Sequence, residues 1–409
     1  MSDRLNNYKN QITQFPIVES SIDYFDFPSL LTSEQNTTRK AFREFLHKEI
    51  APYINEYIEK AQFPDFVLPK FRQFGLFNHL LNAPYGLSSS ILSQGILFAE
   101  ISRVDASLAT FSAVQSSLLM STIEILGSEE QKNKYLPKLR DLELVGGWGL
   151  TEEKVGSDAS SLQTSVKRDP SGKGWILNGN KRWIGNGNKD IMIVWARNVE
   201  NNKVQGFIVD LKSPGVNSVV IKNKLALRMV QNCQIQFNNV HIPEENFLPK
   251  ATDFQKGTSK ILLHSRLIVC WITFGVAMGV YDHTIKYMNE RKQFGVKISS
   301  FQIQQEKIQR IMSNVQAILF LCWRLSVLYD QGNITIGQVA LGKAFATERT
   351  REITRLGREI FGGNGIIFDN YVMKALVDTE ALYTYEGTYD INALVAGREL
   401  TGISAFKTK

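Results

Sequence analysis

The first part of the chain carries apolar residues at the three- and four-residue spacing of an α-helix. After a helix-start signal at residues 32–35, one face is formed by Ala41, Phe42, Phe45 and Ile50. A second start is predicted at Ser128, because Gln131 stands three residues later and can complete a capping box. We therefore expect an N-terminal helical domain over residues 1–144.

From residue 145 to 254 the pattern changes to short apolar runs separated by turn residues, which predicts strands. A β-hairpin is expected where residues 175–177 and 181–184 flank Asn178 and Gly179, since this pair favours a turn with positive φ. Strands at such short intervals predict a compact central domain, either a β-barrel or a β-sandwich. The other strand runs lie at 191–196, 206–211, 219–221 and 234–237.

Helical periodicity returns after residue 255. Two long helices are predicted at 302–329 and 336–360. The longest apolar stretch, residues 267–281, has fifteen residues, which is short for a membrane span and typical of a buried helix. The helical, β, helical order predicts an α+β fold whose last domain, residues 255–409, is a four-helix bundle with no membrane span.

Composition narrows the classes of function. The 409 residues are 43% hydrophobic with no low-complexity run, which excludes a disordered or fibrous protein. The net charge of +7 is spread thinly along the chain, so no nucleic-acid partner is predicted. Three cysteines without a CxxC pair and five histidines without paired spacing predict neither a disulfide framework nor a metal site. The N-terminus has no secretory signal core, so we expect a soluble intracellular protein.

Five segments of the chain carry more specific chemistry. In this order, and on a helical–β–helical background, they resemble the acyl-CoA dehydrogenase and oxidase superfamily. The resemblance extends from about residue 23 to residue 406. The last segment is most similar to the plant peroxisomal short-chain acyl-CoA oxidases and also resembles the glutaryl-CoA dehydrogenases. The segments are 148–158 (WGLTEEKVGSD), 178–186 (NGNKRWIGN), 290–295 (ERKQFG), 361–365 (FGGNG) and 385–391 (YEGTYDI).

The resemblance implies that an acyl-CoA thioester is desaturated between its α and β carbons. A carboxylate must take the α proton, and because no side chain accepts a hydride, FAD is the implied cofactor. Glu386 is the implied base, with its backbone N–H on the thioester oxygen and Gly387 allowing the backbone to approach the substrate. Some relatives carry the base just before a helical arginine. Ser265 and Arg266 occupy those positions here, which leaves Glu386 without a competitor, and Arg266 is expected to order the base region.

The same resemblance assigns a set of residues to the cofactor. Trp183 is similar to a tryptophan that packs on the isoalloxazine, and Ser157 to a position shared by flavin and substrate. Arg291 is implied to reach the FAD of a neighbouring subunit, because its fork suits a pyrophosphate. The implied assembly is a homotetramer built as a dimer of dimers. The full implied set is Leu150, Thr151, Ser157, Trp183, Gly185, Arg291, Phe294, Gly362, Gly363, Thr388 and Asp390.

Three departures from the family pattern bear on substrate and electron acceptor. Ala109 stands where glutaryl-CoA enzymes hold a distal carboxylate with an arginine, so we expect a plain short- or medium-chain acyl-CoA and poor use of glutaryl-CoA. Gly185 replaces a Thr or Ser whose hydroxyl bonds flavin N5, and the hypothesis is that this lets dioxygen reach the reduced flavin. Glu153 replaces a proline without loss of a reactive group. Oxygen and electron-transferring flavoprotein both stay open as acceptor.

Two other classes of function predict different features of the sequence. A non-catalytic scaffold or assembly subunit would be expected to have lost Glu386, Arg291 or Trp183, and a nucleic-acid-binding relative would carry an added basic C-terminal region. The compartment stays undetermined. Residues 4–12 loosely resemble a peroxisomal signal and the C-terminus is not of the Ser-Lys-Leu type, while a mitochondrial matrix or a bacterial cytoplasm fits equally well.

Overall fold

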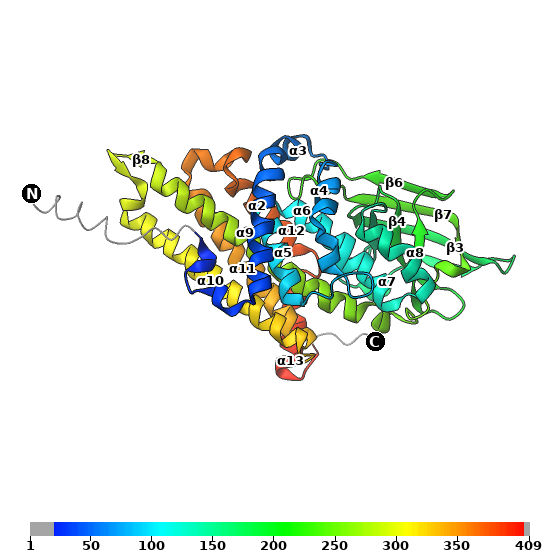
Figure 1. The fold of residues 1–409 in the computed structure, drawn as a ribbon. Coiled ribbons are helices and arrows are strands. Elements are labelled where there is room, and N and C mark those ends of the chain that lie inside the picture. The colour runs from blue at the N-terminus through cyan, green and yellow to red at the C-terminus, as the bar shows by residue number, and fades with distance from the viewer. Residues whose placement is uncertain (1–19, 405–409) are drawn as a thin grey trace, which may run out of the picture.

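A computed structural model describes residues 20–404. The strands gather at one end of the molecule, and long helices of the C-terminal part extend to the other end (Figure 1). The expectations about an N-terminal secretory or peroxisomal signal fall on residues 1–19 and lie outside the described residues. The same holds for residues 405–409 at the C-terminus.

The N-terminal part is helical, and the two predicted helix starts are present. Thr32 and Ser128 each form a capping box with the glutamine three residues later. A π-helix, η5 (Val114–Met120), continues directly from α6 (Ala106–Ala113), so the two form one rod. The other helices are α2 (Ser33–Glu49), α3 (Ile54–Lys60), α4 (Val67–Phe74), α5 (Ile91–Val104), α7 (Ser121–Leu126) and α8 (Glu129–Arg140).

The central part of the described chain contains a mixed seven-stranded sheet with the order β1-β4-β2-β3-β7-β6, in which β5 also pairs with β4. β1 and β2 run parallel to β4, while the other neighbours are antiparallel. Each of the four separate strand runs predicted from the sequence overlaps β4, β5, β6 or β7. The strands are β1 (Gly146–Gly149), β2 (Ser165–Arg168), β3 (Gly174–Ile184), β4 (Ile191–Asn198), β5 (Val204–Asp210), β6 (Val216–Val220) and β7 (Cys233–Pro243).

The hairpin predicted at Asn178 and Gly179 is wrong. β3 passes through both residues as one strand paired with β7, and its register shifts between Leu177 and Gly179. Gly179 has a φ of +140°, and a Cβ there would lie 2.7 Å from atoms of Thr164. The pair therefore marks a β-bulge, where a strand bends without turning back.

The C-terminal part is a helical bundle. The predicted helices at 302–329 and 336–360 are present as α10 (Gln302–Asp330) and α11 (Ile336–Ile360). α9 (Phe254–Glu290) precedes them, followed by the hairpin of β8 (Lys292–Gln293) and β9 (Val296–Lys297). α12 (Val372–Thr384) and α13 (Tyr389–Thr401) complete the bundle. The α+β class with a helical, β, helical order is confirmed, while the boundaries at residues 144 and 254 stay predictions.

Residues 267–281 are buried throughout, as predicted for a core helix. By length and composition alone, α9 and α10 could each cross a membrane. However, 83% of the apolar window of α9 and 50% of that of α10 is covered within this fold. An apolar core helix has the same composition as a membrane span, so burial accounts for α9 without a bilayer.

Candidate active site

Glu386 lies in the short connection between α12 and α13, against the first half of α9 and of α11. Its φ is +53°, a left-handed conformation that is strained for a side chain of this kind. Side chains that donate hydrogen bonds to its main-chain carbonyls hold this connection in place. Arg266 Nε on α9 donates to the Glu386 carbonyl at 3.2 Å, and Asn392 Nδ2 donates to the carbonyls of Gly387 and Thr388 at 2.8 and 3.0 Å. We call residues 385–388 the base turn.

Within residues 20–404, the Glu386 carboxylate has one hydrogen-bonded side-chain partner. Ser265 Oγ donates to its Oε2 at 2.7 Å. Burial raises the pKa of Glu386, while the Ser265 hydrogen bond and the charges of Arg266 and Lys343 act in the opposite direction. A carboxylate with a raised pKa in a partly desolvated position is suited to accept a proton near neutral pH.

The Glu386 N–H has no hydrogen-bond acceptor within residues 20–404. Beyond it, Thr388 Oγ1 accepts the Ile391 N–H at 3.2 Å and thereby caps α13, while Asp390 is exposed on the first turn of that helix. The base turn therefore offers a carboxylate and an unpaired backbone donor side by side.

A second group of predicted residues lies in the β domain, where the segment after β1 meets the end of β3. The Thr151 carbonyl accepts the Arg182 N–H at 2.9 Å. Lys181 Nζ, fully buried, donates to the Leu150 carbonyl at 3.0 Å and to Glu152 at 2.9 Å. The Glu152 carboxylate also accepts two backbone N–H groups, from residues 163 and 164. This buried ion pair fixes the backbone of Leu150 and Thr151, whereas Ser157 is exposed on the following loop.

Trp183 is the second-last residue of β3, and Gly185 directly follows the strand. Trp183 is 51% exposed despite its size and has a φ of +65°, which is strained for an aromatic residue. Gly185 faces two valines: a Cβ there would lie 3.2 Å from Val114 and 3.6 Å from Val230. The room left by the glycine is therefore narrow and apolar.

The rod of α6 and η5 connects these two groups. Thr110 Oγ1 in α6 lies 3.4 Å from the hydroxyl of Tyr385, the residue before the base. One turn later, Val114 lies against Gly185. The base turn and the end of β3 therefore contact the same rod from two domains.

A third group lies elsewhere. Figure 1 places β8 at the opposite end of the molecule from β3. Arg291 directly precedes β8, and Phe294 lies in the turn between β8 and β9. Phe294 is 94% exposed. Hydrogen bonds of Tyr287 with Phe361 and Asn364 place Gly362 and Gly363 at the same end, where a Cβ on either glycine would meet nothing within 4 Å. One chain therefore does not bring these four residues to Trp183 or Glu386.

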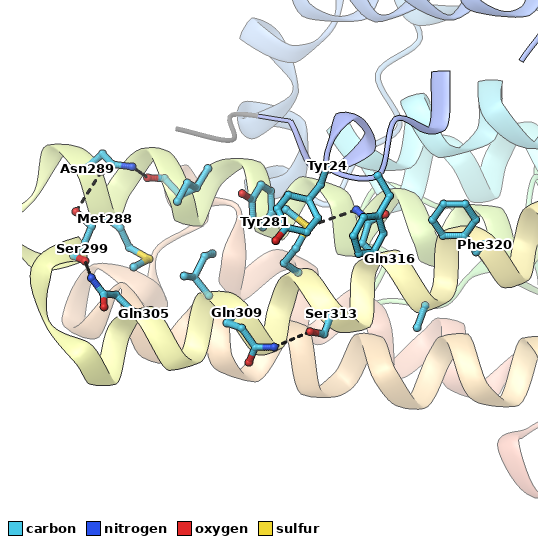
Figure 2. A pocket seen from close by; sticks show the side chains of 15 residues that line it. Tyr24, Tyr281, Met288, Asn289, Ser299, Gln305, Gln309, Ser313, Gln316 and Phe320 are labelled. Carbon is cyan, nitrogen blue, oxygen red and sulfur yellow. Dashed lines mark hydrogen bonds between the residues drawn. The ribbon is translucent and has the colours of Figure 1, made fainter. Parts of the chain in front are cut away.

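A large cavity of the chain lies apart from all three groups. It has a volume of about 710 Å³ and lies between α9 and α10 beside Tyr24 (Figure 2). Its lining is mainly apolar, with Gln309 and Gln316 among the polar members, and it includes no predicted site residue. No cluster of His, Cys, Asp and Glu within residues 20–404 could hold a metal ion.

Two contributors to the base turn, Lys343 and Asn392, were not predicted from the sequence. Lys343 is a cation within a run of small apolar residues on the buried face of α11, and such a position is a signal of a special role. Asn392 is fully buried on α13, and nothing in its sequence context singles it out.

Models of protein families match nearly the whole chain. They are described as acyl-CoA dehydrogenase N-terminal domain, middle domain and C-terminal domain, at residues 32–143, 147–240 and 256–401. The chain belongs to the acyl-CoA dehydrogenase family. A "Probable acyl-CoA dehydrogenase fadE25" of Mycobacterium bovis is 32% identical over 387 residues, covering 93% of this chain and 97% of the relative.

Two further members of the acyl-CoA dehydrogenase family illustrate its range. The mitochondrial short/branched chain specific acyl-CoA dehydrogenase of Rattus norvegicus is 31% identical over 88% of this chain and 84% of its own length. A glutaryl-CoA dehydrogenase from Mycobacterium smegmatis, solved in complex with FADH2, superposes with a TM-score of 0.91. It is 31% identical, and the match covers 95% of this chain and 100% of that chain.

Family membership makes the protein an oxidoreductase that acts on CH–CH bonds, and FAD is the cofactor of the family. The predicted cofactor residues are of types that suit the binding of FAD. A half-exposed tryptophan ring suits a planar aromatic system, and an exposed arginine together with uncovered glycine backbone suits a pyrophosphate. The predicted superfamily and cofactor are confirmed, while the role of each residue stays a prediction.

Proposed function

We propose that this protein oxidises a short- or medium-chain acyl-CoA to the trans-2-enoyl-CoA, with Glu386 as the base. The observation that carries this is the base turn, in which a half-buried carboxylate is held at a strained φ by contacts from α9 and α13. Bound FAD supplies the acceptor for the hydride that leaves the β carbon. Glu386 takes the α proton onto its carboxylate, so that proton and hydride leave adjacent carbons.

The neighbours of Glu386 support this role. Its unpaired N–H is a donor suited to the thioester carbonyl oxygen, where negative charge grows as the α proton leaves. Ser265 fixes the carboxylate rotamer, and Arg266 fixes the backbone while contributing positive charge. Gly387 has a φ of +85°, and a Cβ there would lie 3.0 Å from Asn392 Nδ2, so glycine lets the turn pack against α13.

The cofactor residues support an assembly of several copies. Leu150, Thr151, Trp183 and Gly185 would hold the flavin ring, with Ser157 between flavin and substrate. Thr388 and Asp390, at the start of α13, would complete the cofactor site. Arg291, Phe294, Gly362 and Gly363 lie at the end of the molecule where Figure 1 labels β8. They would complete the site of another copy, which favours a homotetramer in which sites are shared.

Ala109 is the basis for the choice of substrate. It is fully buried in α6, next to Thr110, which contacts Tyr385 of the base turn. A glutaryl chain would bring a second carboxylate toward this helix, and burying that charge without a cation costs several kcal/mol. A plain acyl chain has no such cost, although one similar solved structure is titled a glutaryl-CoA dehydrogenase.

Gly185 bears on the electron acceptor. No side chain at this position donates a hydrogen bond toward the flavin, and the neighbouring groups are two valines. This arrangement favours dioxygen as acceptor over electron-transferring flavoprotein.

One anaerobic titration tests the function. The purified yellow protein is titrated with acyl-CoAs of increasing length and with glutaryl-CoA, and flavin bleaching identifies the substrate. Admission of air, or addition of electron-transferring flavoprotein, then shows which acceptor restores the colour. A protein that binds FAD but is bleached by no acyl-CoA would contradict the proposal, and bleaching by glutaryl-CoA at the rate of a plain chain would contradict the choice of substrate.

A further inference from the structure

Lys343 lies in the first half of α11 with no exposed surface. Its neighbours along the buried face of that helix include Val339, Ala340 and Ala346. A buried ammonium is costly unless its donors are satisfied, so its hydrogen bonds show what the residue is used for.

Within the described residues, both hydrogen bonds of Lys343 go to main-chain carbonyls of one short segment. Nζ donates to the Gly387 carbonyl at 2.6 Å and to the Tyr383 carbonyl at 3.4 Å. Tyr383 belongs to the last turn of α12, where carbonyls lack helical partners, and Gly387 directly follows the base. A single amine thus bridges the two sides of Glu386.

We propose that Lys343 is a positioning residue that holds Glu386 in its working conformation by joining the end of α12 to the base turn. This rests on the proposed role of Glu386 as base. The strained φ of Glu386 persists only if surrounding contacts fix it. Arg266 and Asn392 act on carbonyls of the turn from α9 and α13, and Lys343 supplies the third direction, from α11.

The titratable and charged groups that face Lys343 are Glu386, Arg266 and Cys270. Burial lowers the pKa of Lys343 to about 7. The ammonium has three donors and the neutral amine two, so both forms can bridge the two carbonyls. Only the ammonium also lowers the pKa of Glu386 by its charge.

The test compares Lys343→Met and Lys343→Gln with Lys374→Met as the matched control. Lys374 is another buried lysine of the bundle, but its Nζ binds Asp105 at 2.7 Å and the Val104 carbonyl at 3.1 Å. Hydrogen–deuterium exchange of peptides that cover residues 384–390 gives a readout that needs no turnover. The kcat, the KM and the pH profile of kcat are then measured on protein with verified FAD content.

In K343M we expect the Tyr385 amide, which donates to the Ala381 carbonyl at the end of α12, to exchange about tenfold faster, because this end of the helix then opens locally. The kcat should fall about 100-fold with a small change in KM, since a misplaced base harms the chemical step more than binding. The acid limb of the kcat profile should move to higher pH, because loss of the cation raises the pKa of Glu386. K343Q retains a donor and should lie between K343M and wild type.

K374M should lower thermal stability without changing exchange at residues 384–390 or the pH profile. Unchanged base-turn exchange in both Lys343 variants, or an effect of K374M equal to theirs, would overturn the proposal. If K343M does not fold, the same criteria apply to K343Q. If wild type is bleached by no acyl-CoA, the proposed function fails, while the exchange data still decide whether Lys343 holds the turn.

Discussion

The base turn and the β8–β9 hairpin contain the same backbone strain in opposite surroundings. Glu386 and Phe294 both have a φ of +53°. Around Glu386, three helices supply donors from Arg266, Lys343 and Asn392. Phe294 is 94% exposed, and its ring meets only the edge of Phe301, at 6.0 Å, among the aromatic rings of the described chain.

This difference indicates which part of the candidate site one chain completes and which part needs another copy of the chain. Strain is retained at a functional position when its surroundings hold it. The base turn is held internally, so the proposed proton removal by Glu386 would belong to the single chain. The hairpin lacks such support here, which favours contact with FAD and another copy as its stabilising partner. Substitutions in the two regions should therefore fail in different ways.

The largest effect is expected from Glu386→Gln. The amide keeps the size of the side chain but cannot accept the α proton, so kcat should fall about 10⁴-fold. FAD content and acyl-CoA binding should stay near wild type, because the carbonyl contacts of the turn remain. Single-turnover flavin reduction measures the effect, and activity within tenfold of wild type would exclude Glu386 as the base.

The second effect concerns the hairpin and is expected from Arg291→Ala. Loss of a hydrogen bond to a charged phosphate costs about 1.5–3 kcal/mol, so the Kd for FAD should rise about 10- to 100-fold. The kcat per bound FAD should stay unchanged, in contrast to E386Q. Lys297→Ala, an exposed cation on β9, is the matched control and should leave FAD affinity as it is. A lowered kcat at full FAD occupancy would place Arg291 in the chemical step and remove the distinction between the regions.

The structure also shows which features of the fold could be predicted from sequence patterns. Helix limits follow from local signals, so Thr32, Ser128 and the ends of α10 and α11 could be predicted. The Asn178–Gly179 pair serves a turn or a bulge equally well, and pairing of β3 with β7 decides between them. Lys343 binds a carbonyl 44 residues later, and helical periodicity shows that it is buried without naming its partner.

The residues of the candidate site also divide into those that local motifs predict and those that packing between distant segments places. The segment motifs supplied its residue types, and the exposed Arg291 and Phe294 could be assigned to another subunit only through the resemblance. Asn392 and the buried pair of Lys181 and Glu152 carry no reacting group, so no motif for chemistry includes them. Such supporting contacts are set by packing between distant segments, which a local pattern does not encode.

A smaller effect is expected from Ser265→Ala. The Ser265 hydroxyl donates to Glu386 at 2.7 Å and favours its ionised form. Without it the pKa of Glu386 rises further, so the acid limb of the kcat profile moves to higher pH. At pH 7 the kcat should fall about tenfold. Ser265→Thr keeps the hydroxyl and should restore the wild-type profile, and an S265A profile identical to wild type would show that the hydrogen bond does not tune the base.

The smallest effect is a gain in stability of E386Q that depends on pH. Because burial raises the pKa of Glu386, the folded state binds this proton more tightly than the unfolded state. Wild type therefore loses stability as pH rises from the ordinary carboxyl pKa to the raised one, and the loss is constant above it. The amide does not titrate, so E386Q should exceed wild type in Tm by an amount that grows over this window to about 2 °C. Thermal unfolding between pH 4 and pH 8 measures this difference, with K297A in the hairpin expected to follow wild type at every pH. A Tm of E386Q below that of wild type at every pH would mean that the ionised carboxylate stabilises the turn. The ionised form of Glu386 would then not lower the stability of the fold.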